Sequence, residues 1–267
     1  GGTTRNDAPG GVRTALWFAM RVFLSRPALL VPFLVAGIVV VGVEQAMLAD
    51  PVPITSTAPS AGTGIDLQLP MLPVEQRRVT TPLTAVWGLR PTWLAERALF
   101  AAVTTGTTAL AGAVVVSGMY EGGLRPGLGA LDGTDAARAV GYVVALWLSV
   151  LSLVTLATTV PRLAVPALGL GLFVSVRLFV AFPLVARGVP VEAAVRRSWR
   201  RMRGYGISLG ILLLVLGGLG MSRWIEFGGA GLATVLVGVP QIGTMTVLAH
   251  WTGPTEERGA ETSTDEV

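Results

Sequence analysis

Six long stretches of this chain are almost wholly apolar, and most polar residues fall between them. These stretches are 28–48, 97–119, 139–160, 163–185, 206–221 and 229–251. A helix that crosses a membrane needs about 20 mostly apolar residues, because each residue adds 1.5 Å along the helix axis. The pattern therefore predicts an all-α fold, a polytopic bundle of six transmembrane helices that together form one domain over 15–251.

The segments outside the apolar stretches differ in character. Residues 1–14 are polar and rich in glycine, so we expect a flexible arm. The 49–93 segment is rich in Pro and Thr, and we expect a loosely ordered extracytoplasmic loop, with a small folded cap as the alternative. The tail 252–267 has five acidic residues and one Arg, which is typical of disorder.

The segment 190–203 has apolar and basic residues at helical spacing. Trp199 falls on the apolar face, and Glu192 complements the positive end of the helix. The other face carries Arg196, Arg197, Arg200, Arg201 and Arg203. This pattern predicts an amphipathic helix in the plane of the membrane interface, and the segment before the first span has the same character. The arginines either set the membrane topology, bind anionic lipid headgroups or dock a protein partner.

Composition and charge turn this pattern into an orientation. The chain has 267 residues, of which 52% are hydrophobic and 13% charged, and its mean hydropathy is +0.65. Soluble domains carry about 25% charged residues, so a soluble enzyme and a nucleic-acid-binding module are excluded. Thirteen of the twenty arginines flank the spans on the side of the two termini, and six lie on the other. The positive-inside rule then places both termini in the cytoplasm of a multi-pass protein of the cell membrane.

The residues that the sequence lacks limit its chemistry. It has no Lys and no Cys, and its one histidine is His250. A Schiff-base lysine, a P-loop lysine, a thiolate nucleophile and a Cys- or His-rich zinc site are therefore excluded. We expect no enzymatic activity, no catalytic residue, no cofactor and no metal.

Polar residues inside the apolar stretches form a second candidate site. Arg177 lies about 12 Å from the cytoplasmic end of the 163–185 stretch if that stretch is one helix. Gln241, beside Pro240, lies at similar depth, and Thr108 is also near the middle of its span. A charge at that depth is costly and should face other helices or a cavity. These residues predict an intramembrane polar cluster that either holds the bundle together or lines a transport path.

Two local motifs have a structural or partner-binding meaning. Gly206 and Gly210 form a G-x-x-x-G pattern, which is typical of a packing face between membrane helices. The tripeptide 192–194, Glu-Ala-Ala, resembles the start of the EAA loop by which ABC-transporter permeases engage their ATPase. Ser198 stands where that family has Gly, and no Leu-Pro follows. A transporter or ABC-type permease subunit is therefore the alternative function.

One wider resemblance covers about a quarter of the chain. The segment 177–218, together with 25–27, resembles uncharacterised polytopic proteins related to the membrane domain of glycerophosphodiester phosphodiesterase, including archaeal ones. The residues that carry it are Ser25, Arg26, Pro27, Phe182, Pro183, Ala193, Ser198, Trp199 and Gly204. The resemblance implies a six-helix membrane module without a phosphodiesterase domain. The first expectation is a non-enzymatic membrane protein with a structural, lipid-interacting or accessory role.

Overall fold

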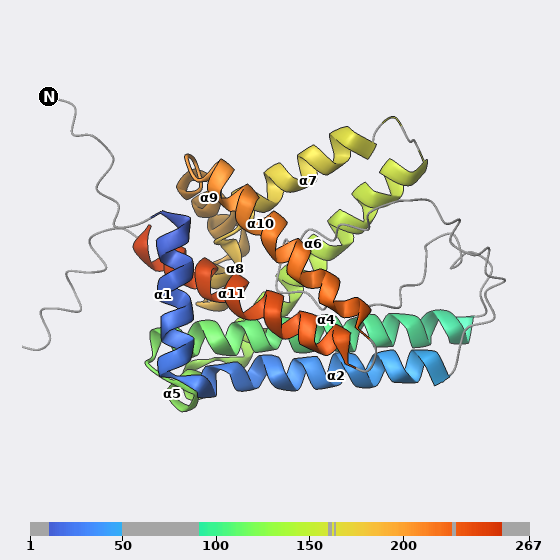
Figure 1. Cartoon of the computed structure of the whole chain (residues 1–267), viewed down its shortest axis with the longest axis horizontal. Coiled ribbons are helices and arrows are strands. Elements are labelled where there is room, and N and C mark those ends of the chain that lie inside the picture. Colours follow the sequence, from blue (N-terminus) through green and yellow to red (C-terminus); the bar gives the residue numbers. More distant parts are fainter. Residues whose placement is uncertain (1–10, 50–90, 160–161, 163, 226–227, 253–267) are drawn as a thin grey trace, which may run out of the picture.

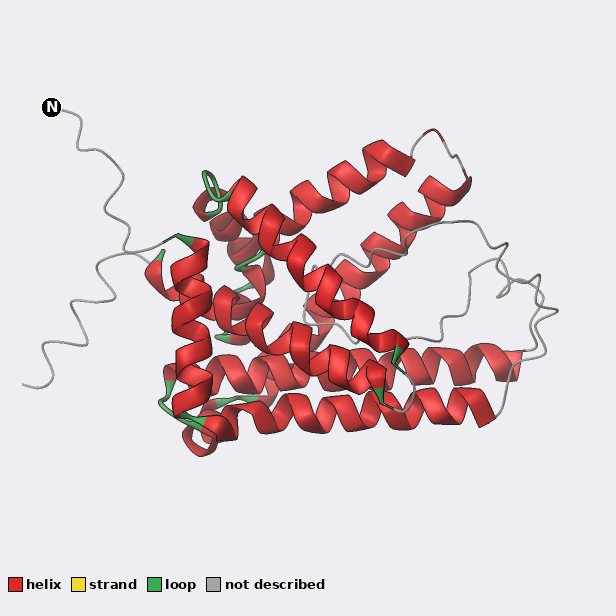
Figure 2. Ribbon diagram, viewed as in Figure 1, coloured by secondary structure: helices red, strands yellow, loops and turns green. Residues whose placement is uncertain are grey.

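The computed structural model describes residues 11–49, 91–159, 162, 164–225 and 228–252. Every regular element in these ranges is a helix (Figure 2). The elements are α1 (Val12–Ser25), η1 (Pro27–Leu30), α2 (Val31–Ala49), α4 (Pro91–Tyr120), α5 (Leu124–Ala130), α6 (Gly133–Thr159), α7 (Ala164–Leu178), α8 (Ala181–Ala186), α9 (Val191–Arg201), α10 (Gly206–Gly220), η3 (Met221–Trp224) and α11 (Gly229–Trp251). The predicted loop 49–93 and tail 252–267 lie almost wholly outside the described residues, and α1 begins inside the predicted arm 1–14.

Four helical segments are long and apolar enough to cross a membrane. They are Pro27–Ala49, Pro91–Tyr120, Gly206–Arg223 and Gly229–Trp251. Each coincides with one of the predicted stretches, although α4 begins six residues earlier than predicted. An all-helical fold with several membrane-compatible helices is therefore confirmed.

The predicted stretch 163–185 is not one helix, and that part of the prediction is wrong. Helix α7 ends at Leu178, two residues form a turn, and the short helix α8 begins at Ala181. Phe179 and Val180 make this turn and are fully buried. Because the turn residues are as apolar as the helices around them, hydropathy alone did not reveal the break.

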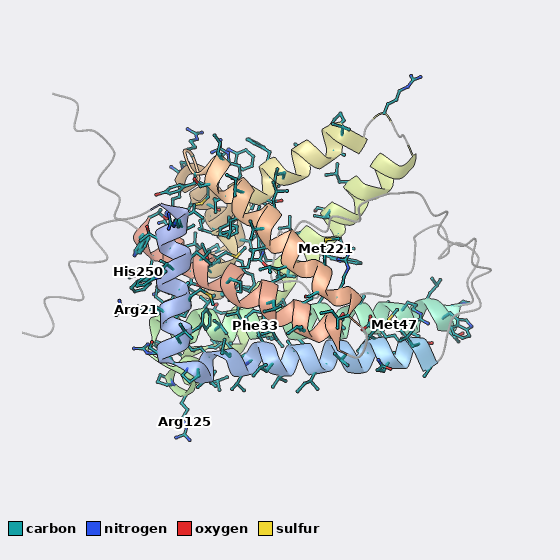
Figure 3. The ribbon with its side chains drawn as sticks, viewed as in Figure 1. Arg21, Phe33, Met47, Arg125, Met221 and His250 are labelled. Atoms are coloured by element: carbon teal, nitrogen blue, oxygen red, sulfur yellow. The ribbon has the colours of Figure 1, made fainter. Side chains whose placement is uncertain are left out.

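Helix α11 is the centre of the packed bundle. In the most apolar 18-residue stretch of α11, 78% of the residues are buried. The corresponding stretch of the Pro27–Ala49 segment has 33% of its residues buried. Glycines bring the α11 backbone close to α2: a Cβ at Gly231 would lie 2.7 Å from the carbonyl oxygen of Gly37. Gly238 likewise faces the ring of Phe33, which Figure 3 shows between the two helices. A side chain on either glycine would push α2 and α11 apart.

The G-x-x-x-G pair of α10 has no such role within the chain. No atom lies within 4 Å of a Cβ placed at Gly206 or at Gly210. The predicted packing face is therefore not used against any other described helix. Close helix–helix approach at glycines occurs elsewhere, between α2 and α11 at Gly37 and Gly231 and between α4 and α5 at Gly118 and Gly127.

The first and last described helices meet at one end of the bundle. Helix α1 runs crosswise to α2 and α4, and the end of α11 lies against it (Figure 1). The ring centroids of Phe18 and Trp251 are 6.1 Å apart. Figure 3 shows Arg21, Arg125 and His250 at this end, which we call the α1 end, and Met47 towards the opposite end. Helices α6 and α7 form a hairpin that leans away from α2 and α4.

Candidate functional site

Helix α9 spans Val191–Arg201, inside the segment 190–203 where a helix was predicted. Glu192 in the first turn and Arg200 and Arg201 in the last turn complement the helix dipole. Gly204 follows with φ +100°, a left-handed conformation that favours glycine and ends the helical segment. The helix packs against α7 and α8, and Ala194 and Ser198 are fully buried. One face of α9 is therefore docked onto the bundle.

The side of α9 that faces the bundle contacts Arg177, which lies at the end of α7. The Ser198 hydroxyl donates a hydrogen bond of 2.7 Å to the backbone carbonyl of Arg177. The Arg177 guanidinium carbon lies 5.1 Å from the ring centroid of Phe173 and 5.7 Å from that of Trp199. The two rings meet edge to face at 5.6 Å. The guanidinium is therefore held by cation–π contacts to rings from two helices.

The arginines on α9 and just after it fall into two groups, one that contacts the bundle and one that is exposed. Arg201 Nη1 lies 3.5 Å from the carbonyl oxygen of Ala249, at the end of α11, so this arginine ties α9 to the central helix. Arg196 pairs with Glu192 at 3.2 Å on the exposed face, where such a pair contributes little stability. The arginines exposed at the surface are Arg196, Arg197, Arg200 and Arg203. They give this end of the bundle a positive surface.

More cation–aromatic contacts surround this surface. The Arg187 guanidinium carbon lies 4.0 Å from the ring centroid of Tyr120, whose ring is 5.7 Å from that of His250. On α1, Arg21 lies 5.4 Å from the ring of Trp17. These residues were not predicted as a group. Their signal in the sequence was an aromatic residue and an arginine at the ends of several apolar stretches, which is the composition of a membrane-interface belt.

The structure does not bring Arg177 together with the other members of the predicted polar cluster. Gln241 on α11 and Thr108 on α4 are both fully buried, and the Thr108 hydroxyl donates to the carbonyl of Thr104 on its own helix. The hydrogen bond and ring contacts of Arg177 join it to α7 and α9 instead. Because α7 ends at Leu178, Arg177 lies in the last turn of its helix.

Two buried charged residues lie elsewhere and were not predicted as site residues. Glu44 on α2 is 6% exposed, and Arg223 on η3 is 2% exposed. Gly229 packs against the Arg223 carbonyl, and Gly231 packs against Gly37 of α2. Helices α2 and α11 run antiparallel, with Gly37 opposite Gly231. This alignment places Glu44 near η3, away from the α1 end. An acidic residue within the apolar 28–48 stretch was the available signal.

The comparisons with known proteins leave the site to be judged on its geometry. Among the described residues, no three His, Cys, Asp or Glu side chains lie together as a metal site would require. Comparison with protein-family models, with curated proteins and with solved structures found no match to this chain.

Proposed function

We propose that this chain is a six-span protein of the cell membrane, without enzymatic activity, that binds anionic lipid headgroups through α9. Both termini lie in the cytoplasm, and the α1 end faces the inner leaflet. The resemblance to the glycerophosphodiester phosphodiesterase membrane domain belongs to this proposal, as a membrane module with no catalytic residues.

The two spans beyond the four long apolar segments come from α6 and from α7 with α8. Helix α6 has 27 residues. At 1.5 Å per residue it is about 40 Å long, which exceeds the roughly 30 Å of a bilayer core. Helix α7 has 15 residues. The short helix α8 follows it and has six residues, all of them buried in the bundle. A hairpin that leans towards the end where α2 finishes and α4 begins supports six crossings (Figure 1).

The observation that carries the lipid proposal is the two-sided character of α9. Its inner face is fixed to α7 by Ser198 and Trp199, so the helix cannot turn its arginines elsewhere. Its outer face presents Arg196, Arg197 and Arg200 at the α1 end, and the exposed Arg203 follows just after the helix. A fixed array of guanidinium groups beside a membrane attracts anionic headgroups, and salt screens that attraction.

Helix α1 supports an interfacial position for this end of the bundle. Its inner residues Ala19 and Phe23 pack against Gly243 of α11. Its outer residues Trp17 and Leu24 are 62% and 81% exposed. Large apolar side chains beside arginines on the outer face of a crosswise helix are typical of helices that lie in the headgroup region.

The test measures how much lipid the full-length protein retains. The protein is purified in an uncharged detergent and incubated with phosphatidylglycerol or phosphatidylcholine, and mass spectrometry then counts the retained lipids at low and high salt. We expect more phosphatidylglycerol than phosphatidylcholine at low salt, and loss of the excess as salt rises. Changing Arg196, Arg197, Arg200 and Arg203 together to Gln should remove the excess. Arg201 stays unchanged because it contacts Ala249.

Two controls separate charge from other effects. The same four positions changed to Lys keep the charge and should keep most of the excess lipid. Glu192→Ala removes an exposed carboxylate and should leave lipid retention unchanged, whereas a helix that docks an ATPase would show the opposite ranking. Retention of the full excess by the four-Gln protein would show that these arginines only set the topology.

A further inference from the structure

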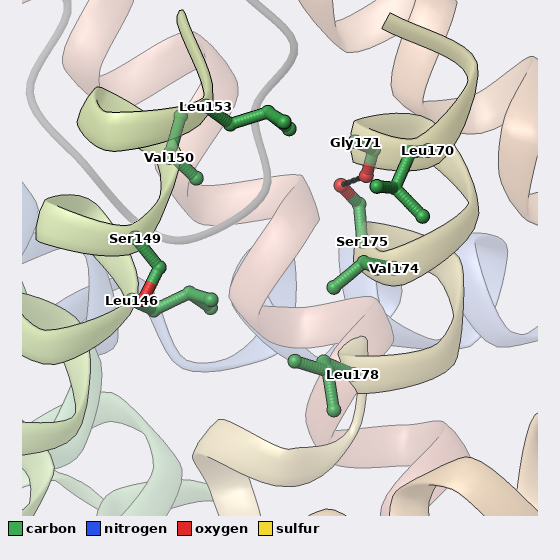
Figure 4. Close-up of a pocket in the computed structure, with 9 residues that line it drawn as sticks. All are labelled: Leu146, Ser149, Val150, Leu153, Leu170, Gly171, Val174, Ser175 and Leu178. Carbon is green, nitrogen blue, oxygen red and sulfur yellow. Dashed lines mark hydrogen bonds between the residues drawn. The ribbon is translucent and has the colours of Figure 1, made fainter. Parts of the chain in front are cut away.

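A groove of about 200 Å³ lies between α6 and α7 and is open on one side. Figure 4 shows the side chains of the two helices facing each other across it. Leucines and valines form most of its wall. The hydroxyls of Ser149 and Ser175 both donate to carbonyls of their own helices, at Ala145 and Gly171. Both serine protons are therefore used within the helices, the rest of the described wall is apolar, and an apolar chain is the occupant that fits it.

A positive charge lies just beyond one end of this groove, outside its lining. Leu170 and Val174 line the groove, and Arg177 follows them on α7 at the spacing i, i+4, i+7, which places all three on one stripe of the helix. Leu178, the next residue, closes that end of the groove. The amphipathic helix α9 lies beside it and adds further arginines.

One N–H group of the Arg177 side chain lacks an acceptor. Its Nη1 atom is buried and has no hydrogen-bond partner among the described residues. Its cation–π contacts hold the guanidinium in place, but they do not supply an oxygen acceptor for that N–H. A buried donor of a charged group that lacks an acceptor costs free energy, so binding of an anionic oxygen there is favoured.

We propose that the groove and Arg177 together bind one anionic phospholipid. Its acyl chain lies between α6 and α7, and a phosphate oxygen accepts the hydrogen bond from Arg177 Nη1. This site rests on the membrane location proposed above but not on lipid binding by α9. It differs from the α9 surface in holding the chain as well as the headgroup, so its lipid should resist salt.

The test again uses the full-length protein in uncharged detergent, now at about 500 mM salt, where exposed charges are screened. After incubation with phosphatidylglycerol, mass spectrometry should detect one retained lipid per protein. Ser149→Trp fills the groove from α6 and should lower this retention about tenfold or more. Leu148→Trp is the matched control, because Leu148 is exposed next to the groove but does not line it. Val174→Phe fills the groove from α7, so the test does not depend on one variant folding.

Arg177→Gln tests the headgroup. It should reduce the preference for phosphatidylglycerol over phosphatidylcholine about tenfold, while the chain still binds. Millimolar inorganic phosphate should not displace the lipid. Displacement by phosphate, or a wild-type preference in Arg177→Gln, would overturn the phospholipid site. So would equal retention by the Ser149→Trp, Val174→Phe and Leu148→Trp proteins.

The four-Gln protein separates this site from the α9 surface. It should lose the salt-sensitive lipid and keep the salt-resistant one. Loss of both would place the resistant lipid on α9 and overturn the groove site. Retention of both would contradict the proposed function of α9 and leave the groove site supported.

Discussion

Arg177 shows how a charged residue is accommodated at the end of an apolar helix. Its guanidinium contacts two aromatic rings, and its backbone carbonyl accepts the hydrogen bond from Ser198. A cation over an aromatic face gains about 0.5–2 kcal/mol, depending on how far the pair is removed from water. These contacts also fix α9 to α7, so one residue links the two helices.

The contacts of Arg177 predict energetic coupling with Trp199 and none with Gln241. Arg177→Leu and Trp199→Leu remove the same cation–π contact, so the double variant should lose less stability than the sum of the single ones. The expected coupling is about 0.5–2 kcal/mol, measured by thermal unfolding in detergent. Arg177→Leu combined with Gln241→Leu should be additive. Coupling in that second pair, with none in the first, would restore the polar cluster predicted from the sequence.

Ser198 makes a second prediction at this scale. Its side chain is fully buried, and its hydroxyl bonds the carbonyl of Arg177 at 2.7 Å. Ser198→Ala should lower the free energy of unfolding by about 1 kcal/mol, since the carbonyl loses a partner and is not rehydrated. Ser208→Ala on α10, where the serine is exposed, is the control and should change it little. Equal unfolding temperatures for the two variants would show that the α7–α9 hydrogen bond does not contribute.

The sequence identified Arg177 as a residue of interest but did not show that it lies at the end of its helix. The stretch around it is apolar from end to end, and the turn that follows is made by Phe179 and Val180 rather than by Gly or Pro. The available local signal was Pro183 in the first turn of α8, because proline has no N–H to bond the Phe179 carbonyl and continue α7. The packing of α8 against α6 and α11 then holds the turn.

At the scale of helices, close approach of α2 and α11 depends on glycine. A Cβ at Gly231 would lie 2.7 Å from the Gly37 carbonyl oxygen and 2.8 Å from a methyl group of Val41. Both distances are too short for real contacts, and a backbone carbonyl cannot move aside alone. Gly231→Ala should therefore lower the free energy of unfolding by about 1–3 kcal/mol.

A matched variant separates this clash from the change in helix propensity. Gly42 is also in the interior of a helix, and no atom lies within 4 Å of a Cβ placed there. Gly42→Ala should be neutral or slightly stabilising, because alanine is favoured over glycine in helices. Thermal unfolding of both variants checks the pair. A Gly231→Ala protein as stable as Gly42→Ala would mean that α2 and α11 are packed less closely than described.

Helix types were more predictable than helix partners. The period of apolar and basic residues predicted α9 to within two residues at each end, because that pattern is local. The choice of packing glycines was not local: Gly206 and Gly210 carry the known motif, yet Gly231 and Gly238 make the close contacts. Sequence spacing identifies a face that is able to pack, whereas the partner depends on how the helices are arranged.

For the whole molecule, the two described ends of the chain lie at one end of the bundle. Helix α1 and the end of α11 are in contact, with α9 tied to α11 through Arg201 and Ala249. A chain that starts and finishes on one side of a membrane crosses it an even number of times. Four crossings and six crossings both satisfy this condition, so the hairpin of α6 and α7 decides between them.

Single cysteines in this Cys-free chain distinguish the two topologies. Thr134 begins α6 and is exposed, and Arg162 lies between α6 and α7 and is also exposed. Ser60 belongs to the predicted outer loop, outside the described residues. With six spans and the arginine-rich α1 end in the cytoplasm, a membrane-impermeant thiol reagent should label cysteines at Ser60 and Arg162 in intact cells and leave Thr134 unlabelled until the cells are opened. Labelling of Ser60 without Arg162 would show that the hairpin does not cross, and labelling of Thr134 alone would invert the orientation. Since the lipid proposals need α9 and Arg177 at the inner leaflet, that last result would also move their proposed ligand to the outer one.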